Sequence, residues 1–494
     1  MANISRRSML AGMAVMPFSL WLQKYGPTPR RKYIRYDARS PQGQAMLKIY
    51  AGAVCTMMDS TQIKEEDPLS WVFQWYTHWV KGSTSKTAEI NRIYGPNPSP
   101  HKSLANDMWD TCQAHGAGEN EDFFLPWHRM YVYYFESIIR HVSKHPEFTL
   151  PYWNYSTSAP SIHGVMPDEF RKQNDPTYKC LFVDKRNKPN PNVNAGDPID
   201  KNDPGALDLT ALRQTTYSPS GAAPGFNMDL DQTVHGNVHV LVGNGQNMGS
   251  VPWAAGDPIF WMHHCNIDRL WASWNHCGGS NPTDPAWLNQ QFTFADAQGN
   301  KVMTAIKDVN TTAQLHYSYD HLEPCPFRFP VLSAAELAAI KPVTLASVTP
   351  GTPLGKEPVR LSLEPKAPEL QQKPFSEHLR LMAPKRKLYL VIKNLRAEVH
   401  PGVLYHVYLG LPEGTQPKGA RQYQVGTINF FNAVPHQNHG DSQSGNANNK
   451  FYSFEVTEAA RKTLKDKPSV TIAPFGEPAA EAKPMVGEVS LVEQ

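Results

Sequence analysis

The sequence predicts a mainly α-helical domain followed by a C-terminal β-sandwich-like domain, and two patterns support this prediction. Between residues 26 and 280, apolar residues recur at helical spacing, interrupted by long loops rich in proline, asparagine and glycine. From residue 375 onward, short runs of alternating apolar and polar residues are separated by turns, which is typical of strands. A chain of 494 residues is also long enough for about two to four domains.

Segments with helical spacing are bounded by residues that favour helix ends. Gly243 is expected to end the third helix, and Pro258 suits the first turn of the fourth. The segment 183–226 is rich in asparagine, proline, glycine and aspartate and is expected to form a long surface loop. The predicted helices span residues 69–79, 130–142, 229–242 and 257–274.

Prolines recur every few residues between Phe327 and Pro374, which predicts a semi-rigid linker between the two domains. After this linker, short apolar runs rich in β-branched and aromatic residues predict strands. These runs are residues 388–394, 404–409, 423–431 and 469–473.

The composition excludes several classes of function. Lys and Arg number 48 against 45 Asp and Glu, so a net charge of +3 provides no basic field for nucleic acid. The apolar stretch Met9–Leu22 is shorter than the about 20 residues that a membrane span needs. It follows the pair Arg6-Arg7, so residues 1–25 predict a twin-arginine signal, the Tat export machinery as a partner, and a periplasmic or secreted protein. The alternative is a frayed N-terminal arm on a cytoplasmic protein.

The chain has 6 cysteines, widely scattered and without a CxxC pair. In an exported protein they would allow one or two disulfides, but their spacing does not assign the partners. Cys112 stands out because it lies three residues before His115.

The histidines give the strongest functional signal. His235 and His239 are four residues apart, which places both imidazoles on one face of a helix, where they can hold one metal ion. The glutamate that follows the first histidine in zinc proteases is absent. Downstream, His264 and Asp268 are also one helical turn apart, and we expect Asp268 to accept the ring N–H of His264.

A second group of histidines lies upstream and consists of His78, His115 and His128. Glu136 follows two turns beyond this group and is expected to support it. Two groups of three histidines without bridging carboxylates predict two all-imidazole metal sites. Imidazole suits zinc, copper, iron and nickel, whereas di-iron bundles recruit glutamate ligands. His263 is expected to point about 100° away from its neighbour His264 on the helix.

Two long segments resemble the copper-binding signatures of tyrosinases and polyphenol oxidases. Phe124–Glu136 (FLPWHRMYVYYFE) is similar to the copper-A signature, and Asp257–Asp268 (DPIFWMHHCNID) is similar to the copper-B signature. Further segments resemble the family and its plant-type extensions: residues 151–155, 287–294, 315–319 and 425–436. The resemblance covers most of the chain after about residue 45, apart from the loop 183–226.

This resemblance implies a four-helix-bundle dicopper catalytic domain with long loops over residues 26–280. An extension over 281–326 would pack on it, and the linker 327–374 would lead to a C-terminal β domain over 375–494. In such enzymes the C-terminal domain often shields the copper cleft. We therefore expect partial latency that limited proteolysis or mild SDS relieves.

The resemblance also implies a binuclear centre of two copper ions, each held by three histidines. Prolines beside His101 indicate a loop, so His101 is only the alternative to His78 as the first copper-A ligand. Some relatives join a cysteine to the middle copper-A histidine by a thioether, which Cys112 would form here; the alternative is a buried free thiol. The implied ligands are His78, His115 and His128 for copper A, and His235, His239 and His264 for copper B.

The implied activity is the oxidation of small phenols by O2, both o-hydroxylation of monophenols and oxidation of o-diphenols to o-quinones. A phenol with an ordinary pKa of about 10 must first lose its proton, and Asp231, four residues before His235, is the expected base. Asp229 is the alternative. Relatives place an asparagine directly after the first copper-B histidine, where this chain has Gly236. Asn237 follows one position late and is the second candidate catalytic residue.

The substrate entrance is expected to be formed by Gly236, Val240 and Val251. Val240, next to His239, offers no arginine to hold a substrate carboxylate, and Val251 would leave the entrance open to phenols. Three alternatives remain open. They are a catechol oxidase acting on o-diphenols only, a hemocyanin-like O2 carrier and a zinc hydrolase.

Overall fold

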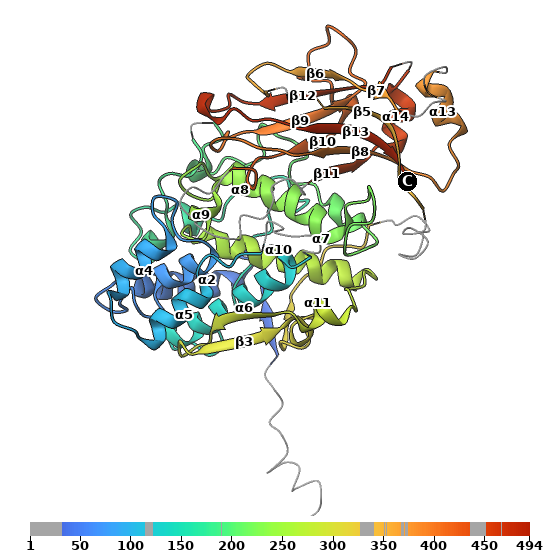
Figure 1. Cartoon of the computed structure of the whole chain (residues 1–494). Coiled ribbons are helices and arrows are strands. Elements are labelled where there is room, and N and C mark those ends of the chain that lie inside the picture. Colours follow the sequence, from blue (N-terminus) through green and yellow to red (C-terminus); the bar gives the residue numbers. More distant parts are fainter. Residues whose placement is uncertain are drawn as a thin grey trace, which may run out of the picture.

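The protein consists of a helical domain and a β domain that lie against each other (Figure 1). This computed structural model describes residues 32–494 apart from 114–121, 189, 327–339, 350, 352, 367–369, 371–373, 435–450 and 466. The expected signal at residues 1–25 and the expected ligand His115 lie outside the described residues. The predicted fold class, a mainly α-helical domain followed by a C-terminal β domain, is confirmed.

Four helical segments form the centre of the helical domain. α6 (Phe124–Ser143) packs against both α2 (Pro41–Met58) and α10 (Ile259–His276). The fourth segment starts with α7 (Gly225–Leu230) and runs without a break through the π-helical turn η5 (Asp231–His235) into α8 (Gly236–Val242). This helix ends at Gly243, as predicted. Single π-helical turns inside helices are frequent at functional sites.

Shorter elements surround this centre. α3 (Trp71–His78), α4 (Lys86–Tyr94) and α5 (Pro100–Met108) each begin after a serine whose hydroxyl accepts a backbone N–H, which satisfies a free donor at the helix start. Strand β1 (Tyr33–Arg35) pairs in parallel with β4 (Tyr317–Tyr319), so distant parts of the chain close the domain. The remaining elements are α9 (Val251–Ala254), α11 (Pro285–Asn289), β2 (Gln291–Ala295) and β3 (Lys301–Ala305).

The β domain has two sheets around a core of its own. Two short helices, α13 (Phe375–Leu381) and α14 (Thr457–Thr463), pack beside them. One sheet has the strand order β10 (Gln424–Ile428), β9 (Leu404–Leu409), β12 (Ser469–Phe475) and β6 (Val359–Ser362). The other has the order β11 (Phe451–Glu455), β8 (Leu388–Lys393), β13 (Glu488–Glu493), β5 (Val343–Val348) and β7 (Glu364–Pro365).

Two sequence predictions about loops need correction. Strands β5, β6 and β7 lie inside the expected linker 327–374; β6 and β7 are edge strands, where proline is tolerated because one side needs no hydrogen bonds. The segment 183–226 is not a surface loop, because many of its apolar side chains are buried. Arg186 within it forms a buried ion pair of 2.7 Å with Asp257, just before α10. Irregular backbone hides such burial from any periodic pattern.

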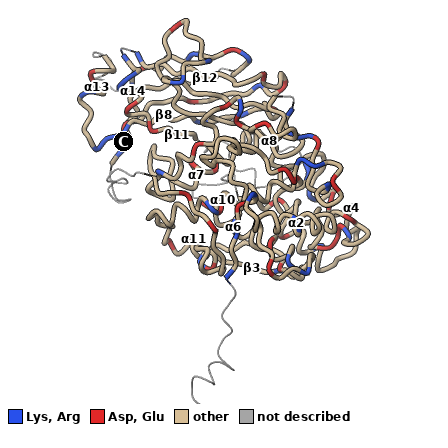
Figure 2. The backbone as a smooth tube through the Cα atoms, turned by 180° about the vertical axis from the view of Figure 1, so that it is seen from behind, with Lys and Arg blue, Asp and Glu red and all other residues tan. Residues whose placement is uncertain are grey.

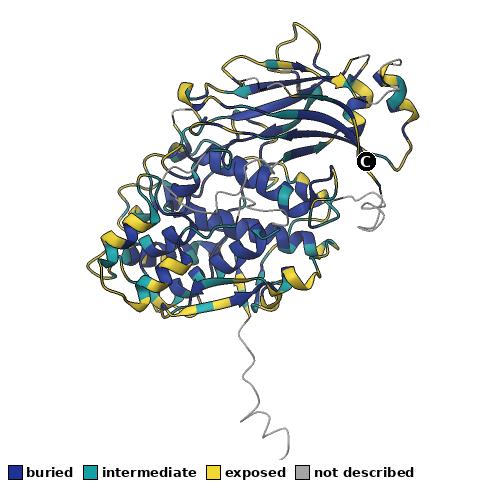
Figure 3. Cartoon of the chain, viewed as in Figure 1, coloured by how far each residue is buried: buried dark blue, intermediate teal, exposed yellow. Residues whose placement is uncertain are grey.

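The two domains share a buried contact surface. Phe431 and Leu404 of the β domain belong to the apolar core of the helical domain. Polar contacts add to it, since Nε2 of His406 lies 3.1 Å from Oδ1 of Asp203. Figure 3 shows buried residues continuing from α7 and α8 into the facing strands. A further small apolar cluster joins Ala222 and Ala223 to Tyr389, Val391 and Val492.

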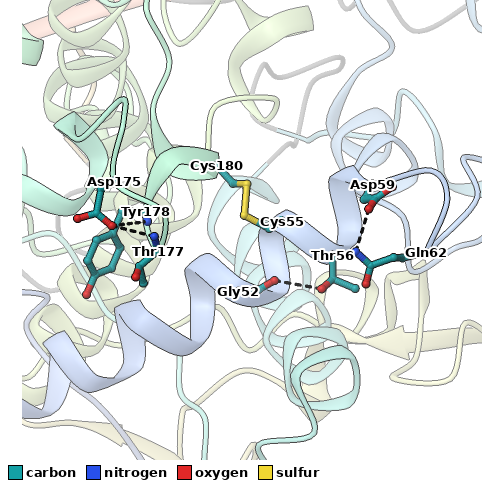
Figure 4. Close-up of a disulfide and its surroundings, with 9 residues drawn as sticks. All are labelled: Gly52, Cys55, Thr56, Asp59, Gln62, Asp175, Thr177, Tyr178 and Cys180. Atoms are coloured by element: carbon teal, nitrogen blue, oxygen red, sulfur yellow. Dashed lines mark hydrogen bonds between the residues drawn. A yellow bond between two sulfur atoms is a disulfide. The ribbon is translucent and has the colours of Figure 1, made fainter.

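Disulfides hold two parts of the helical domain. Cys55 on α2 is bonded to Cys180, which fixes the segment around residues 175–180 against that helix (Figure 4). Cys277 at the end of α10 is bonded to Cys325. Cys112 and Cys265 are the cysteines without a disulfide.

The surface matches the charge balance of the sequence. Lysine and arginine alternate with aspartate and glutamate over the described part of both domains, without a broad region of one sign (Figure 2). Among the described helices, none combines the length and apolar character that a membrane crossing requires.

Candidate metal centre

The helical domain brings four imidazoles together on two facing helices. His235 and His239 project from the continuous helix η5–α8, and His263 and His264 project from α10. Their ligand atoms all lie within 4.8 Å of one another. We call these four residues the B-side group. His263 was expected to point away, but the structure places it within this group.

A second group lies beside the first. His78 at the end of α3, His128 on α6 and Cys112 have ligand atoms within 4.8 Å of one another, and we call these residues the A-side group. The Sγ atom of Cys112 lies 3.6 Å from Nε2 of His128. His101 lies on α5, not in a loop, and is part of neither group among the described residues.

Backbone carbonyls orient three of these imidazoles in the same way. The Nδ1 atom of His128 lies 2.8 Å from the carbonyl oxygen of Phe124, and that of His239 lies 2.7 Å from the carbonyl oxygen of Met248. Nδ1 of His235 likewise lies 3.0 Å from the Asp231 carbonyl oxygen. If each Nδ1 donates its proton to a carbonyl, each Nε2 keeps a lone pair for a metal. The Nε2 atoms of His235 and His239 converge to 3.1 Å.

Burial favours the neutral form of four of these imidazoles. It lowers the pKa of His128, His239, His263 and His264 well below the ordinary histidine value, and neighbouring imidazoles lower the pKa of each further. Neither ring nitrogen of His263 or His264 has a hydrogen-bond partner among the described residues, although both rings are fully buried. Buried polar atoms of this kind call for a ligand. Imidazole donors, with the Cys112 sulfur beside them, therefore fit a transition metal such as copper.

The two groups adjoin each other. The ring of His264 stacks on that of His128, with centroids 4.4 Å apart and an interplanar angle of 16°. Phe124 packs against both His128 and His235, at 4.9 and 4.7 Å between centroids. Phe260 covers the other side of His264 at 4.1 Å. The arrangement supports two closely spaced metal ions in an apolar enclosure.

The expected hydrogen bond from His264 to Asp268 is not formed, so this prediction was wrong. The carboxylate of Asp268 instead accepts hydrogen bonds from Arg129 at 2.5 Å and from Arg35 at 3.1 Å. It also accepts hydrogen bonds from the hydroxyls of Tyr317 and Tyr319, each at 2.5 Å. Asp268 therefore ties α10 to α6 and to the β1–β4 pair, below the histidines.

Glu136 belongs to the same buried network. Its carboxylate accepts a hydrogen bond from Arg35 at 2.9 Å and from the backbone N–H of Leu150 at 2.8 Å, and it pairs with Arg140. Although burial raises the pKa of Glu136, Arg35 and Arg140 lower it below the ordinary value. Glu136 thus supports the helix that bears His128, without contacting the histidine itself in any hydrogen bond described.

The candidate catalytic residues lie close to the B-side group. Oδ1 of Asp231 is 2.9 Å from Nδ1 of His235, the nitrogen that faces away from the other imidazoles. Asn237 uses both ends of its amide elsewhere: it donates to the carbonyl of Ala206 and accepts from Asn429 of the β domain. Asp229 accepts a hydrogen bond from Gln214, and burial raises the pKa of Asp229 to about 6.

The β domain covers the B-side group. Phe431 stacks on His239, with centroids 4.2 Å apart and an interplanar angle of 12°, and it meets His235 edge-on at 5.9 Å. Gly236 faces the side chain of Asn429. The other two residues expected at the substrate entrance, Val240 and Val251, are buried. In the described state the expected entrance is therefore closed.

Comparison with known proteins identifies this kind of site. The model of the common central domain of tyrosinase matches residues 68–203 and 175–277, and the polyphenol oxidase middle domain matches residues 281–328. Residues 346–494 match a domain of unknown function. The chain is 29% identical over 457 residues to a tyrosinase of Hahella sp. (strain CCB-MM4), which covers 86% of this chain and 92% of that protein.

Plant relatives match a smaller part. The chloroplastic catechol oxidase B of Solanum tuberosum is 29% identical over 338 residues, 60% of this chain and 55% of that protein. The chain thus spans little more than half of that plant enzyme. The structure of latent apple tyrosinase has the same fold, with a TM-score of 0.59 at 19% identity over 94% of this chain and 98% of that chain.

These findings define a type-3 copper oxidoreductase, in which a pair of copper ions is held by histidines. The chain contains the common central domain of tyrosinase and the polyphenol oxidase middle domain, and its general activity is the copper-dependent oxidation of phenols.

Sequence reasoning missed the groups that enclose the site. Phe431 and Asn429 lie in the segment 425–436 that resembles plant enzymes, but nothing local in that segment predicts a contact with helices about 190 residues away. Phe260 and Phe124 flank the signature histidines, and their hydrophobicity alone was a weak signal. The role of Arg35 could not be predicted, because its partners Glu136 and Asp268 lie 101 and 233 residues away in the sequence.

Proposed function

We propose that this protein uses its copper pair and O2 to hydroxylate monophenols at the ortho position and to oxidise o-diphenols to o-quinones. The supporting observation is the direct contact of the two histidine groups, with the rings of His128 and His264 4.4 Å apart. We propose His78, His115 and His128 as the ligands of one ion and His235, His239 and His264 as those of the other. The bound copper pair supplies the O2 binding and the redox chemistry.

The substrate class follows from the ring that covers His239. Phe431 lies parallel to this imidazole at 4.2 Å, so a planar aromatic ring fits there without rearrangement of the helical domain. A phenol would take the same place once the β domain withdraws. The apolar walls formed by Phe124 and Phe260 exclude water from the ring.

Asp231 is proposed as the residue that separates monophenol from diphenol chemistry. As a base it would accept the phenolic proton, whereas its contact with Nδ1 of His235 supports a second role in positioning that imidazole. Two substitutions distinguish the roles. Asp231→Asn keeps a polar acceptor but loses the charge, so it should abolish monophenol oxidation and spare diphenol oxidation if Asp231 is the base. Asp231→Ala should weaken both, together with copper binding, if positioning dominates.

The decisive experiment assays one monophenol and its matching o-diphenol with the same copper-loaded, protease-treated protein. Quinone formation from both supports the proposal. Quinone from the diphenol alone would select the catechol oxidase alternative, and reversible O2 binding without any quinone would select a carrier. Measured zinc in place of copper would revive the hydrolase alternative.

We further propose that the full chain is latent, because the docked β domain buries Phe431 against the two histidines. Limited proteolysis or mild SDS should raise the rate of quinone formation. Equal rates before and after either treatment would contradict latency.

We also propose export through the twin-arginine pathway and a thioether at Cys112. Export through the twin-arginine pathway is supported by two disulfides, which form in oxidising compartments. Replacing Arg6-Arg7 by lysines should trap the protein inside the cell. A thioether from Cys112 to His115 would leave Cys265 as the single alkylatable thiol after denaturation, and alkylation of Cys112 would contradict it.

A further inference from the structure

Gly236 has a backbone conformation that does not require glycine. It is the first residue of α8, directly after η5, with φ −62° and ψ −36°, which is ordinary right-handed helix. Alanine is the better helix former at such a position. The glycine is therefore explained by the lack of room for a side chain and not by backbone strain.

A side chain of the β domain fills that space. A Cβ atom added to Gly236 would lie 2.7 Å from Nδ2 and 2.8 Å from Oδ1 of Asn429, well inside van der Waals contact. Asn429 directly follows strand β10, and only 4% of it is exposed. The missing side chain of one domain is thus replaced by an amide of the other.

Hydrogen bonds prevent this amide from moving aside. Nδ2 of Asn429 donates to the carbonyl of Gln232 at 2.8 Å and to Oδ1 of Asn237 at 3.0 Å, both in the helical domain. Its Oδ1 accepts the backbone N–H of Phe431 at 3.2 Å. The hydroxyl of Tyr452 bonds both backbone groups of Asn429, at 3.1 and 3.0 Å. Any rotation of the amide would break contacts on both sides of the interface.

We propose that Gly236 and Asn429 form a latch that docks the β domain and aligns Phe431 on His239. The latch deepens the latency proposed above and depends on it for its biological meaning. Asn429 lies two residues before Phe431 and accepts its N–H, so a displaced amide also displaces the ring. Gly236 is therefore a determinant of docking, in addition to any effect it has on phenol chemistry.

Hydrogen–deuterium exchange of the full chain tests the latch without relying on activity. Gly236→Ala should speed exchange in residues 228–240 and 426–433 by roughly tenfold, because overpacking of a buried contact favours the undocked state. Helix propensity alone predicts the opposite, slower exchange in 228–240. Gly52→Ala on α2 is the matched control, since a Cβ there would meet nothing within 4 Å. It should leave both segments unchanged.

A double-mutant cycle with Asn429→Ala assigns the effect to this pair. Asn429→Ala alone should loosen docking through its lost hydrogen bonds, and Gly236→Ala should then add no further increase, because the clash is gone. An equal increase in both backgrounds, or slower exchange in the single variant, would overturn the latch. The rate of quinone formation before protease should rise in parallel in Gly236→Ala. A protein without any phenol oxidation would refute the proposed function but leave the exchange result readable.

Discussion

The two sides of the metal centre are built differently. The B-side histidines come from two long helices at spacings of four residues or one, all within described and buried backbone. The A-side group takes His78 from the last residue of an 8-residue helix and His128 from α6, and the expected third ligand of this copper ion, His115, lies outside the described residues. One side is fixed by helix geometry, and the other depends on loops around it.

The sides also differ in what covers them. Phe431 of the β domain contacts the B-side group. Asn429 packs on η5–α8, the helix that bears His235 and His239. Among the described aromatic contacts, the A-side histidines meet only residues of the helical domain and of the B-side group. The proposed latency would therefore act through the B-side group, which Phe431 contacts directly.

Removal of a ligand from either side gives the largest expected effect. His128→Ala and His264→Ala should each reduce quinone formation to background and lower the copper content, because each site has only three imidazole ligands in this proposal. His263→Ala is the control on the neighbouring residue and should keep both copper ions. The number of copper ions per chain, measured for each variant, shows whether His264 or His263 is the ligand. Retained copper in His264→Ala with loss in His263→Ala would reverse the assignment.

Asp268 connects the two sides, and its loss should give the next largest effect. Asp268→Asn leaves Arg129 buried without a carboxylate partner, whereas Arg35 keeps Glu136, and this should lower the free energy of unfolding by about 3–5 kcal/mol. Urea-induced unfolding measures this change. Asp107→Asn, which breaks the exposed 2.7 Å pair with Lys301, is the control and should cost less than about 1 kcal/mol. A comparable loss of unfolding free energy in both variants would show that the buried network contributes no more to stability than an exposed ion pair.

The sequence predicted the B-side better than the A-side for the same geometric reason. The spacing of His235 and His239 predicts their proximity directly, because residues i and i+4 share a helix face. No local rule relates His78 to His128, which are brought together by the packing of α3 near α6. The hydrogen bond expected between His264 and Asp268 failed because the two arginines and two tyrosines that surround the carboxylate come from distant segments.

Predictions of the fold succeeded where patterns are periodic. The helices around His128 and His264 and the strand at residues 388–393 lie in apolar segments that the sequence marks clearly, and all three are largely buried. The segment 183–226 has no period, so its burial between helical core and β domain was not predictable. The strands among the prolines of 340–366 were missed because each is short and two of them are edges.

Opposite pH dependence is expected for two buried carboxyls, one on each side. Burial raises the pKa of Asp229 on α7 to about 6 from 3.8, so its ionisation destabilises the fold as pH rises through this range, and the cost persists above it. The pKa of Glu136 on α6 is lowered by Arg35 and Arg140, against the effect of burial. Glu136 therefore stabilises the fold above pH of about 4.5, and this contribution is lost in acid.

Thermal unfolding of two variants between about pH 3.5 and 8 tests the signs of these two contributions to stability. The lower limit is roughly the ordinary carboxyl pKa, and the upper limit is well above it. Asp229→Asn should be more stable than the wild type by about 1–3 kcal/mol above pH 6 and equal to it near the acid limit. Glu136→Gln should be less stable at neutral pH, with a difference that shrinks in acid. If the stability of both variants relative to the wild type changed with pH in the same direction, the predicted opposite pH dependence would be wrong.

The smallest effect is expected from Phe431, the ring that stacks on His239. Phe431→Ala removes a stacked contact worth about 0.5–1.5 kcal/mol, so the untreated chain should oxidise an o-diphenol roughly 2- to 10-fold faster. After limited proteolysis the variant and the wild type should have the same rate, because the ring is then absent from both sites. Phe292→Ala, at a partly exposed aromatic of β2 that packs on Phe123, serves as the control and should remain latent. If Phe431→Ala left the untreated rate unchanged, the β domain would restrict the site by blocking access from further out, and the contrast between the two sides would not explain latency.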